Sequence, residues 1–192
     1  AEAKLIYRYL KYHGSSGKGE LLDVACGTGR HIAYWQKFYR CVGVDVSGGA
    51  ISLAKKHVPG AAFLVADMRT LRLGKKFDVV TCLFGSIAYT RTLSKLRKVL
   101  RILAMHVKTD GFLVIEPWLS PKKFVSGFAS SGYFQSAQGT IYRLSLSHKR
   151  AHGANIEEYY LVTRNGTVRY YHDMHLLGLF DVTTICNELK QL

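Results

Sequence analysis

The sequence predicts an α/β fold, in which helices cover both faces of a mostly parallel sheet. The first observation is that short, continuous apolar stretches alternate with helical patterns through residues 21–117. Strands that are apolar throughout are typical of parallel sheets buried on both faces. The second observation is the stretch LLDVACGTG at residues 21–29, in which a strand runs through a glycine turn into a helical pattern. Together they indicate a doubly wound, Rossmann-like sheet, whose ligands bind beyond the carboxyl ends of the strands.

The elements of this sheet follow from the spacing of the apolar residues. Residues 1–12 carry apolar side chains at helical spacing, and the Gly-Ser-rich loop 14–19 ends this helix. Strands are expected at residues 21–25, 41–46, 61–67, 77–84 and 111–117. Helices are expected at residues 29–38, 48–57 and 92–107, the last with leucines along one face.

A different pattern begins after Pro121. Residues 133–171 alternate and are rich in Tyr, Ser, Thr and Val, and Asn165-Gly166 is a hairpin-turn signal. This pattern predicts a small antiparallel sheet of about three strands, inserted after the fifth parallel strand. Asp181 is the expected N-cap of a final helix. We therefore predict three regions: a ligand-binding Rossmann-like core at 1–120, an inserted antiparallel subdomain at 121–180, and a helix at 181–192 that returns to the core.

The composition restricts the class of protein. The 192 residues are 48% hydrophobic and 21% charged, enough for one domain with a sizeable core. No stretch approaches the roughly 18 consecutive apolar residues of a membrane span, and the first residues lack the apolar core of a signal peptide. We therefore expect no membrane partner. Widely separated cysteines favour a reducing cytoplasm and predict neither a disulfide framework nor a metal site: Cys26, Cys41, Cys82 and Cys186.

The chain is strongly basic. Its 27 Lys and Arg residues against 13 Asp and Glu residues give a formal net charge of +14. A basic surface attracts nucleic acid, and it equally suits a small phosphorylated substrate. The basic residues are scattered along the whole chain, so the charge leaves both kinds of partner open.

The glycine turn restricts the ligand further. A dinucleotide-binding turn needs a third glycine where this chain has Ile32, and no lysine follows as in a phosphate-binding loop. What remains are acids associated with three successive strands, Asp23, Asp45 and Asp67. Carboxylates suit an ammonium, a ribose diol and an exocyclic amine, whereas they repel a pyrophosphate. S-adenosylmethionine has this layout of amino acid, ribose and adenine, and it carries no phosphate.

The stretches LLDVACGTGRH, VGVDVS and FLVADMRTL resemble the successive cofactor motifs of class I S-adenosylmethionine-dependent methyltransferases. The resemblance implies that Gly27 and Gly29 let the backbone close over the methionyl part, while Asp23 holds the turn and the ammonium end. The other implied cofactor contacts are Asp45 with the ribose hydroxyls, Asp67 with the adenine amine, Met68 on the adenine ring, Leu83 and Phe84 along the methionine and sulfonium, and Ala25, Cys26 and Val46 in the same turns.

The second half of the chain resembles a narrower family. FGSIAYT (84–90), IEPWLSPKKF (115–124) and HDMHLLGLF (172–180) are similar to the TDP-3-amino-sugar N,N-dimethyltransferases of the desosamine and mycaminose type. The resemblance implies transfer of one or two methyl groups to the amine of a nucleotide-linked sugar. It also implies that Trp118 and Tyr89 face this small-molecule substrate, and that the inserted sheet shapes the substrate side and a homodimer contact.

The implied reaction needs little acid–base chemistry. A sulfonium is an activated methyl donor, so transfer requires mainly alignment and a neutral amine, and a weak base helps by taking the ammonium proton. Position predicts three candidates for this base: Glu116 after the fifth strand, Tyr89 after the fourth, and His175 in the inserted region. Each also has a structural interpretation, because Glu116 can fix a turn, Tyr89 can pack at the rim, and His175 can be an ordinary sheet residue.

Two alternative functions stay open at this point. The charge and the 12 tyrosines suit an RNA methyltransferase. Against it, residues 83–86 read LFGS, where an Asn-Pro-Pro-Tyr motif would clamp a flipped base. The other alternative is a cofactor-binding partner subunit without catalysis, against which the intact set of cofactor acids argues.

Overall fold

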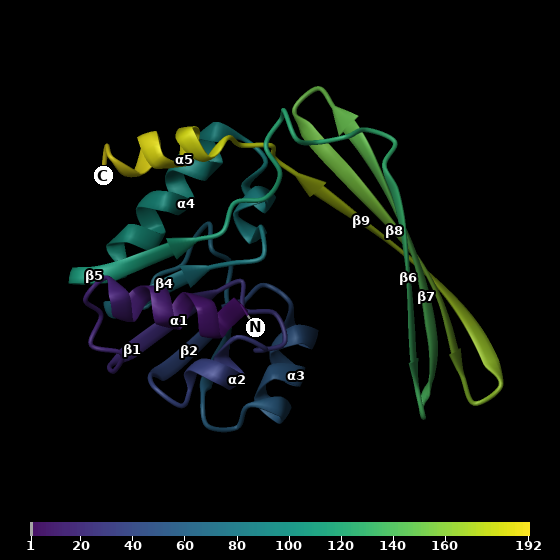
Figure 1. The fold of residues 1–192 in the computed structure, drawn as a ribbon, viewed down its shortest axis with the longest axis horizontal. Helices are drawn as coiled ribbons and strands as arrows, with labels where there is room; N and C mark the ends of the chain where they lie inside the picture. The colour runs from purple at the N-terminus through teal and green to yellow at the C-terminus, as the bar shows by residue number, and fades with distance from the viewer. Residues whose placement is uncertain (1) are drawn as a thin grey trace.

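The computed structural model describes residues 2–192 and contains two separate β-sheets (Figure 1). One sheet has five parallel strands in the order β3-β2-β1-β4-β5, and the other has four antiparallel strands in the order β6-β7-β8-β9. The predicted Rossmann-like sheet with an added antiparallel sheet is therefore confirmed. The prediction of about three antiparallel strands was wrong by one strand.

The parallel sheet and its helices form the body of the molecule (Figure 1). Its strands are β1 (Glu20–Val24), β2 (Arg40–Asp45), β3 (Ala62–Val65), β4 (Phe77–Cys82) and β5 (Val107–Ile115). The helices are α1 (Glu2–Tyr12), α2 (Ile32–Trp35), α3 (Gly48–His57), the 3₁₀ helix η1 (Ser86–Thr90), α4 (Leu93–Met105) and α5 (Val182–Leu189).

Alternate side chains of the central strand enter two different cores. Leu21 packs in one cluster with side chains of α1, α2 and α3, including the fully buried Trp35. Leu22 packs on the opposite face against α4, whose buried Leu96, Leu100 and Leu103 recur at helical spacing, and against α5. Helices therefore cover both faces, which explains why the strands read as continuous apolar runs.

The helix predicted at residues 29–38 is reduced to the single turn of α2. The chain turns back immediately after it, and the backbone N–H of Arg40 donates to the carbonyl of Gly19 (2.8 Å) where β2 begins. The return into the sheet leaves no length for further helical turns. Strand β5 begins four residues earlier than predicted, and the register of the β4–β5 pair shifts between Phe77 and Val79.

The antiparallel sheet extends to one side of the body as a long, twisted blade (Figure 1). The two-residue turn at Asn165-Gly166 joins its last two strands, and both residues have positive φ (50° and 72°), as the sequence predicts. Its strands are β6 (Ala129–Ser136), β7 (Gly139–Arg150), β8 (Gly153–Arg164) and β9 (Thr167–Leu177).

The chain returns to the body at α5. Asp181 occupies the N-cap position as predicted, although its side chain makes no capping hydrogen bond. Ile185 is buried in the core, and the guanidinium of Arg97 on α4 donates to the Glu188 carboxylate at 2.7 Å. Within residues 2–192 there is no helix with the length and hydropathy needed to cross a membrane.

Candidate functional site

The turn after β1 has a backbone that few residue types tolerate. Ala25, Gly27 and Gly29 all have positive φ, at 60°, 55° and 77°. A non-glycine residue such as Ala25 in this region carries strain of about 1–3 kcal/mol, which is typical of binding turns. A Cβ added to Gly27 would meet nothing within 4 Å, so the space over this residue is open to a ligand.

Gly29 packs against the protein core and does not face the open side of the turn. A Cβ at Gly29 would lie 3.1 Å from the Phe63 ring and 3.3 Å from the Ala54 side chain. Both neighbours belong to the buried core. Gly29 does not line the cleft formed by the described residues, so its expected contact with the methionyl part stays a prediction.

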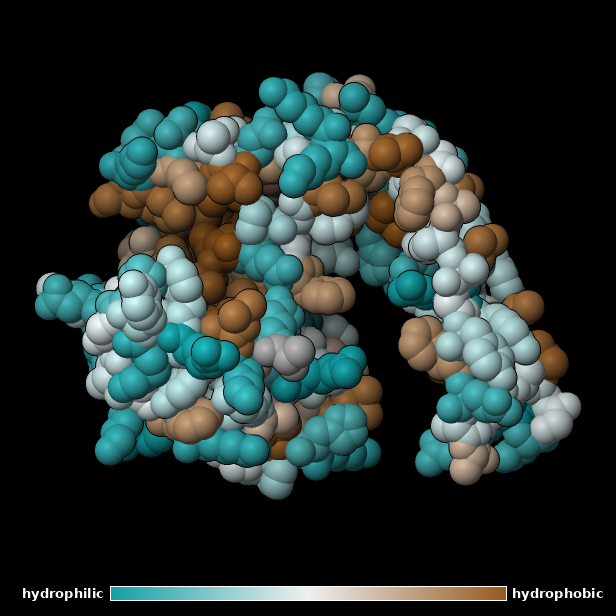
Figure 2. Space-filling model, viewed as in Figure 1, coloured by the Kyte–Doolittle hydropathy of each residue, from teal (hydrophilic) through white to brown (hydrophobic). Residues whose placement is uncertain are grey.

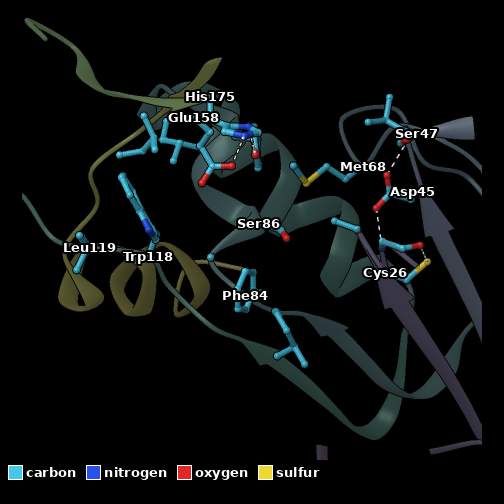
Figure 3. Close-up of a pocket in the computed structure, with 18 of the residues that line it drawn as sticks. Cys26, Asp45, Ser47, Met68, Phe84, Ser86, Trp118, Leu119, Glu158 and His175 are labelled. Carbon is cyan, nitrogen blue, oxygen red and sulfur yellow. Dashed lines mark hydrogen bonds and ion pairs between the residues drawn. The ribbon is translucent and has the colours of Figure 1, made fainter. Parts of the chain in front are cut away.

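The Asp45 carboxylate holds two neighbouring turns together. Its Oδ2 accepts a hydrogen bond from the backbone N–H of Gly27 at 2.8 Å, and its Oδ1 accepts one from the N–H of Ser47 at 2.9 Å. Figure 3 shows this bridge between the turn after β1 and the start of α3. A carboxylate offers about four acceptor positions, so both oxygens can still accept from a ribose diol.

The Asp23 carboxylate is buried beneath the turn, with 2% of the residue exposed. Its Oδ1 accepts from the Thr81 hydroxyl at 2.7 Å, whereas its Oδ2 has no hydrogen-bond partner within residues 2–192. Burial raises the pKa of Asp23 to about 6, against the opposing effect of the Thr81 hydrogen bond. A buried acceptor without a partner, on the wall of a cleft, suits a cationic group.

Asp67 and Met68 follow β3 and line the same cleft, as does Val46 after β2. The Asp67 carboxylate accepts from the Nε of Arg69 at 2.9 Å. The Arg69 guanidinium lowers the pKa of Asp67 more than burial raises it. Asp67 is therefore ionised at neutral pH. The backbone N–H and the guanidinium of Arg69 bind both of its carboxylate oxygens, so its expected contact with the adenine amine stays a prediction.

The turn after β4 lines the same cleft, and β4 is the neighbour of β1 in the sheet. Leu83 is buried and Phe84 is 83% exposed, with a positive φ of 54°. The backbone N–H of Phe84 donates to Oε2 of Glu116 at 2.5 Å. Burial raises the pKa of Glu116; the Phe84 hydrogen bond opposes this shift and the nearby Glu2 carboxyl adds to it. Glu116 acts on the cleft through the Phe84 backbone and is not among its lining residues.

A single cleft of about 1700 Å³ connects these turns with the antiparallel sheet. Figure 2 shows it as a hollow between the body and the blade. Trp118 stands in this cleft from the segment after β5, with its ring 5.8 Å from that of Phe124 (Figure 3). Leu119 also lines the cleft.

Tyr89 of the short helix η1 and His175 of the antiparallel sheet meet at the cleft. Tyr89 lies on η1 and His175 on β9, and the phenol oxygen is 2.8 Å from Nδ1 of the imidazole. Glu158 lies beside His175 in Figure 3, with its carboxylate 3.8 Å from Nε2. Glu158 is a site residue that no local sequence pattern indicates, because only the register of β8 against β9 brings it to this face.

Comparison with known proteins identifies the family. A family model described as a methyltransferase domain matches residues 21–111. The chain is 35% identical, over 83% of its length and 68% of the relative's, to dTDP-3-amino-3,4,6-trideoxy-alpha-D-glucopyranose N,N-dimethyltransferase of Streptomyces venezuelae. The chain belongs to the dTDP-amino-sugar N,N-dimethyltransferase family. A second relative, the dTDP-4-amino-2,3,4,6-tetradeoxy-D-glucose N,N-dimethyltransferase of Saccharopolyspora spinosa, is 36% identical over 83% of the chain and 65% of its own length.

Solved structures of sugar methyltransferases have the same fold. The sugar N-methyltransferase KedS8 from Streptoalloteichus sp ATCC 53650 matches with a TM-score of 0.91 and 33% identity, over 100% of this chain and 77% of that one. DesVI of Streptomyces venezuelae matches with a TM-score of 0.92 and 31% identity, over 99% and 81%. Another matching structure, CalS10 from Micromonospora echinaspora, is described as bound to S-adenosylmethionine and as an amino pentose methyltransferase (TM-score 0.88, 28% identity, over 99% and 80%).

The residues of this methyltransferase fit S-adenosylmethionine, the methyl donor of the family. The open space above Gly27 admits a ligand against the backbone, and the unpartnered Oδ2 of Asp23 suits an ammonium group. The Asp45 carboxylate is held by two backbone N–H groups in a position to accept from vicinal hydroxyls. Asp23, Gly27 and Asp45 all line the same cleft.

Gly85 offers a test of how the methyltransferase positions Trp118. Gly85 has a φ of 67°, and an added Cβ would lie 2.9 Å from the Cβ of Trp118. We expect Gly85→Ala to cost about 1–3 kcal/mol of stability through strain and the clash, and to displace the Trp118 ring. Thermal unfolding measures the first effect. The change in tryptophan fluorescence measures the second, since the other tryptophan, Trp35, is buried in the core. An unchanged spectrum and melting temperature would show that the turn relaxes freely. Gly74→Ala is the matched control, since it has a similar φ and open space around it.

Proposed function

We propose that this methyltransferase transfers methyl groups from S-adenosylmethionine to the amine of a nucleotide-linked amino sugar. The observation that carries the proposal is the cleft that joins the donor turns to the inner face of the antiparallel sheet. The printed activities of the two relatives, both N,N-dimethylations of dTDP-amino sugars, support this choice of acceptor. Residues 1–120 would bind the donor, residues 121–180 the acceptor, and the helix at 181–192 would close the core.

In this proposal the chain contributes alignment and exclusion of water. The bound donor supplies an activated methyl group on a sulfonium. Gly27, Asp23 and Asp45 hold the amino-acid and ribose parts, and Asp67 and Met68 hold the adenine. Leu83 and Phe84 border the reacting methyl, and Trp118 and Tyr89 orient the acceptor. Alignment of this kind supplies a large part of the acceleration of a displacement reaction.

Three side chains are proposed to take the amine's proton, and they differ in access to the cleft. Tyr89 and His175 line it, whereas Glu116 holds the Phe84 N–H from behind the turn. We expect Glu116→Gln to lower kcat less than about threefold, because glutamine keeps the acceptor for the Phe84 N–H. Initial rates at saturating donor measure this effect. A fall of about 10²-fold, the size of a lost general base, would instead make Glu116 the base.

The direct test supplies the purified chain with S-adenosylmethionine and dTDP-3-amino-3,4,6-trideoxy-alpha-D-glucopyranose. Mass spectrometry that finds one or two added methyl groups on the sugar supports the proposal. Methylation of RNA but not of the sugar would favour the RNA alternative, as would an RNA affinity that falls steeply with salt. Binding of donor with no turnover on either acceptor would favour the partner-subunit alternative.

Two further proposals concern the setting of the enzyme. The outward face of the blade carries exposed aromatic side chains such as Tyr133, Tyr142 and Tyr170, and we propose that two copies pair through it as a homodimer. Light scattering of the wild type and of Tyr142→Glu tests this pairing.

The cysteines are free thiols, which supports the proposal that the enzyme works in a reducing cytoplasm.

A further inference from the structure

The contact between Tyr89 and His175 joins the two halves of the cleft. Its distance of 2.8 Å is that of a full hydrogen bond, although the two residues are 86 positions apart. Tyr89 lies at the cleft surface on η1, and the β9 segment that carries His175 packs against this short helix. The phenol therefore faces the cleft on one side and the imidazole on the other.

Charged side chains surround the far nitrogen of His175. Its Nε2 lies 3.6 Å from the Asp173 carboxylate and 3.8 Å from that of Glu158. The strand register places all three on one face of the sheet, since Glu158 pairs directly with Asp173. Glu158 is itself held by Arg143 at 3.7 Å and by the Tyr160 hydroxyl.

The Asp173 side chain is more exposed than its neighbour His175. The His175 side chain is 29% exposed, and that of Asp173 is 65% exposed. A proton that reaches His175 therefore has an acceptor next to it that is open to solvent. The carboxylates of Asp173 and Glu158 also stabilise a positive charge on the imidazole ring between them.

Dimethylation creates a need for such a path. Each transfer breaks the bond between the sulfonium sulfur and the methyl carbon, so that the sulfur leaves as the neutral thioether of S-adenosylhomocysteine. It forms a C–N bond in the same step and leaves the nitrogen as a positively charged ammonium. A second transfer requires a lone pair on that nitrogen, so one N–H proton must leave first. A protein acceptor beside the nitrogen can take this proton at once, without a hydroxide or a free base from solution.

We propose that Tyr89, His175 and Asp173 form a proton relay that returns the bound methylammonium to a neutral amine between the two transfers. The inference rests on the proposed function and assigns the protein's part in its second step. The ammonium gives one N–H proton to the phenol oxygen of Tyr89, while the phenol gives its own proton to Nδ1 of His175. Tyr89 ends as a neutral phenol, His175 as an imidazolium, and the amine regains its lone pair. Asp173 then passes the Nε2 proton to solvent.

The state of Tyr89 agrees with this role. Burial raises the pKa of Tyr89, and the carboxylates of Asp173, Glu158 and Asp45 raise it further. The side chain is therefore a neutral phenol at neutral pH, able to accept one proton and donate another. Glu158 is a positioning residue here, because Arg143 and Tyr160 hold it and it acts through His175.

The test compares His175→Gln and Tyr89→Phe with the wild type over a range of pH, using the dTDP-3-amino sugar and measuring monomethyl and dimethyl products separately. At neutral pH we expect the rate of the second methylation to fall about 10²-fold in each variant, so that monomethyl product accumulates. Above the pKa of the methylammonium the variants should approach the wild-type rate, because solvent then takes the proton without the relay. Asp173→Asn should lower the rate of the second methylation with the same pH dependence, but by a smaller factor.

Matched controls separate the relay from a loss of structure. Tyr171→Phe removes an exposed hydroxyl on β9, and His152→Gln changes an exposed turn residue; both should keep the wild-type product ratio at every pH. A variant rate that is lowered equally at all pH values, or a product ratio that does not change, would overturn the relay. If the wild type methylates no amino sugar, the proposed function fails, whereas an active wild type with unaffected His175→Gln rejects only the relay.

Discussion

Replacement of Asp23 by asparagine is expected to stabilise the protein at neutral pH and to weaken donor binding at the same time. The Asp23 carboxylate is buried, and one of its oxygens has no partner within the described residues. An ionised group without a counter-charge in such a place opposes folding. Asparagine keeps an acceptor for the Thr81 hydroxyl and removes the charge.

The pH dependence of this effect has a definite sign. Burial raises the pKa of Asp23 from the ordinary 3.8 to about 6 in the folded state. The contribution of Asp23 to stability is therefore fully present at a pH below its pKa in the unfolded chain, and it is lost as the pH rises through about 6. The loss amounts to about 3 kcal/mol at most. We expect Asp23→Asn to melt roughly 5–10 °C above the wild type at neutral pH, and the two to converge below about pH 4.

Donor binding by the same variant should change in the opposite direction. Loss of a charge-assisted hydrogen bond to an ammonium costs about 1.5–3 kcal/mol, or roughly 10- to 100-fold in Kd. Calorimetric titration with S-adenosylhomocysteine measures this change in Kd. Asp78→Asn is the matched control, since Asp78 binds Lys108 and the N–H of Glu20 at the other end of the sheet. It should lose stability and keep donor affinity. A less stable Asp23→Asn with wild-type affinity would contradict the assignment.

Replacement of Asp45 by alanine is expected to abolish donor binding at practical concentrations. The substitution leaves the N–H groups of Gly27 and Ser47 without their acceptor and frees the turn after β1. It also removes the proposed acceptor for the ribose hydroxyls. Charge-assisted hydrogen bonds contribute about 1.5–3 kcal/mol each, so we expect Kd for S-adenosylhomocysteine to rise by roughly 10³-fold or more.

Asp67→Asn tests whether this result is specific to the position. Asp67 lines the same cleft, but Arg69 occupies part of its carboxylate. We expect a smaller rise in Kd, of about tenfold, for this variant. Equal effects at Asp45 and Asp67 would mean that general negative charge, and not the bridge between the two turns, holds the donor. Circular dichroism of both variants checks that the sheet is intact.

Much of the donor side could be predicted from the sequence because it depends on local order. A short apolar strand, a turn with positive φ and an acid at the end of the next strand lie within residues 21–45. In a parallel sheet neighbouring strands end at the same edge, so acids at successive strand ends must converge. For this reason the sequence predicts that Asp45 and Asp67 line one cleft, even when no contact between distant residues is known.

The role of individual residues at that edge depended on packing. Gly29 fits against Phe63 and Ala54 instead of the open cleft, and Glu116 binds the Phe84 N–H from behind its turn. A sequence pattern lists residue types that suit a ligand, but the direction of each side chain follows from its neighbours in the core. Likewise, only the tertiary structure shows that Oδ2 of Asp23 has no hydrogen-bond partner, because this depends on the positions of all neighbouring donors.

The sequence by itself determined the fold class, the donor and the family, because these follow from periodicity, turn chemistry and motifs read along the chain. Only the tertiary structure decided what lies opposite the donor. Tyr89 and His175 are far apart in the chain, and Glu158 and Asp173 share a face with His175 only through the strand register. A shift of one residue in that register would turn these side chains to the other face, so the acceptor side depends on long-range pairing that no local pattern encodes.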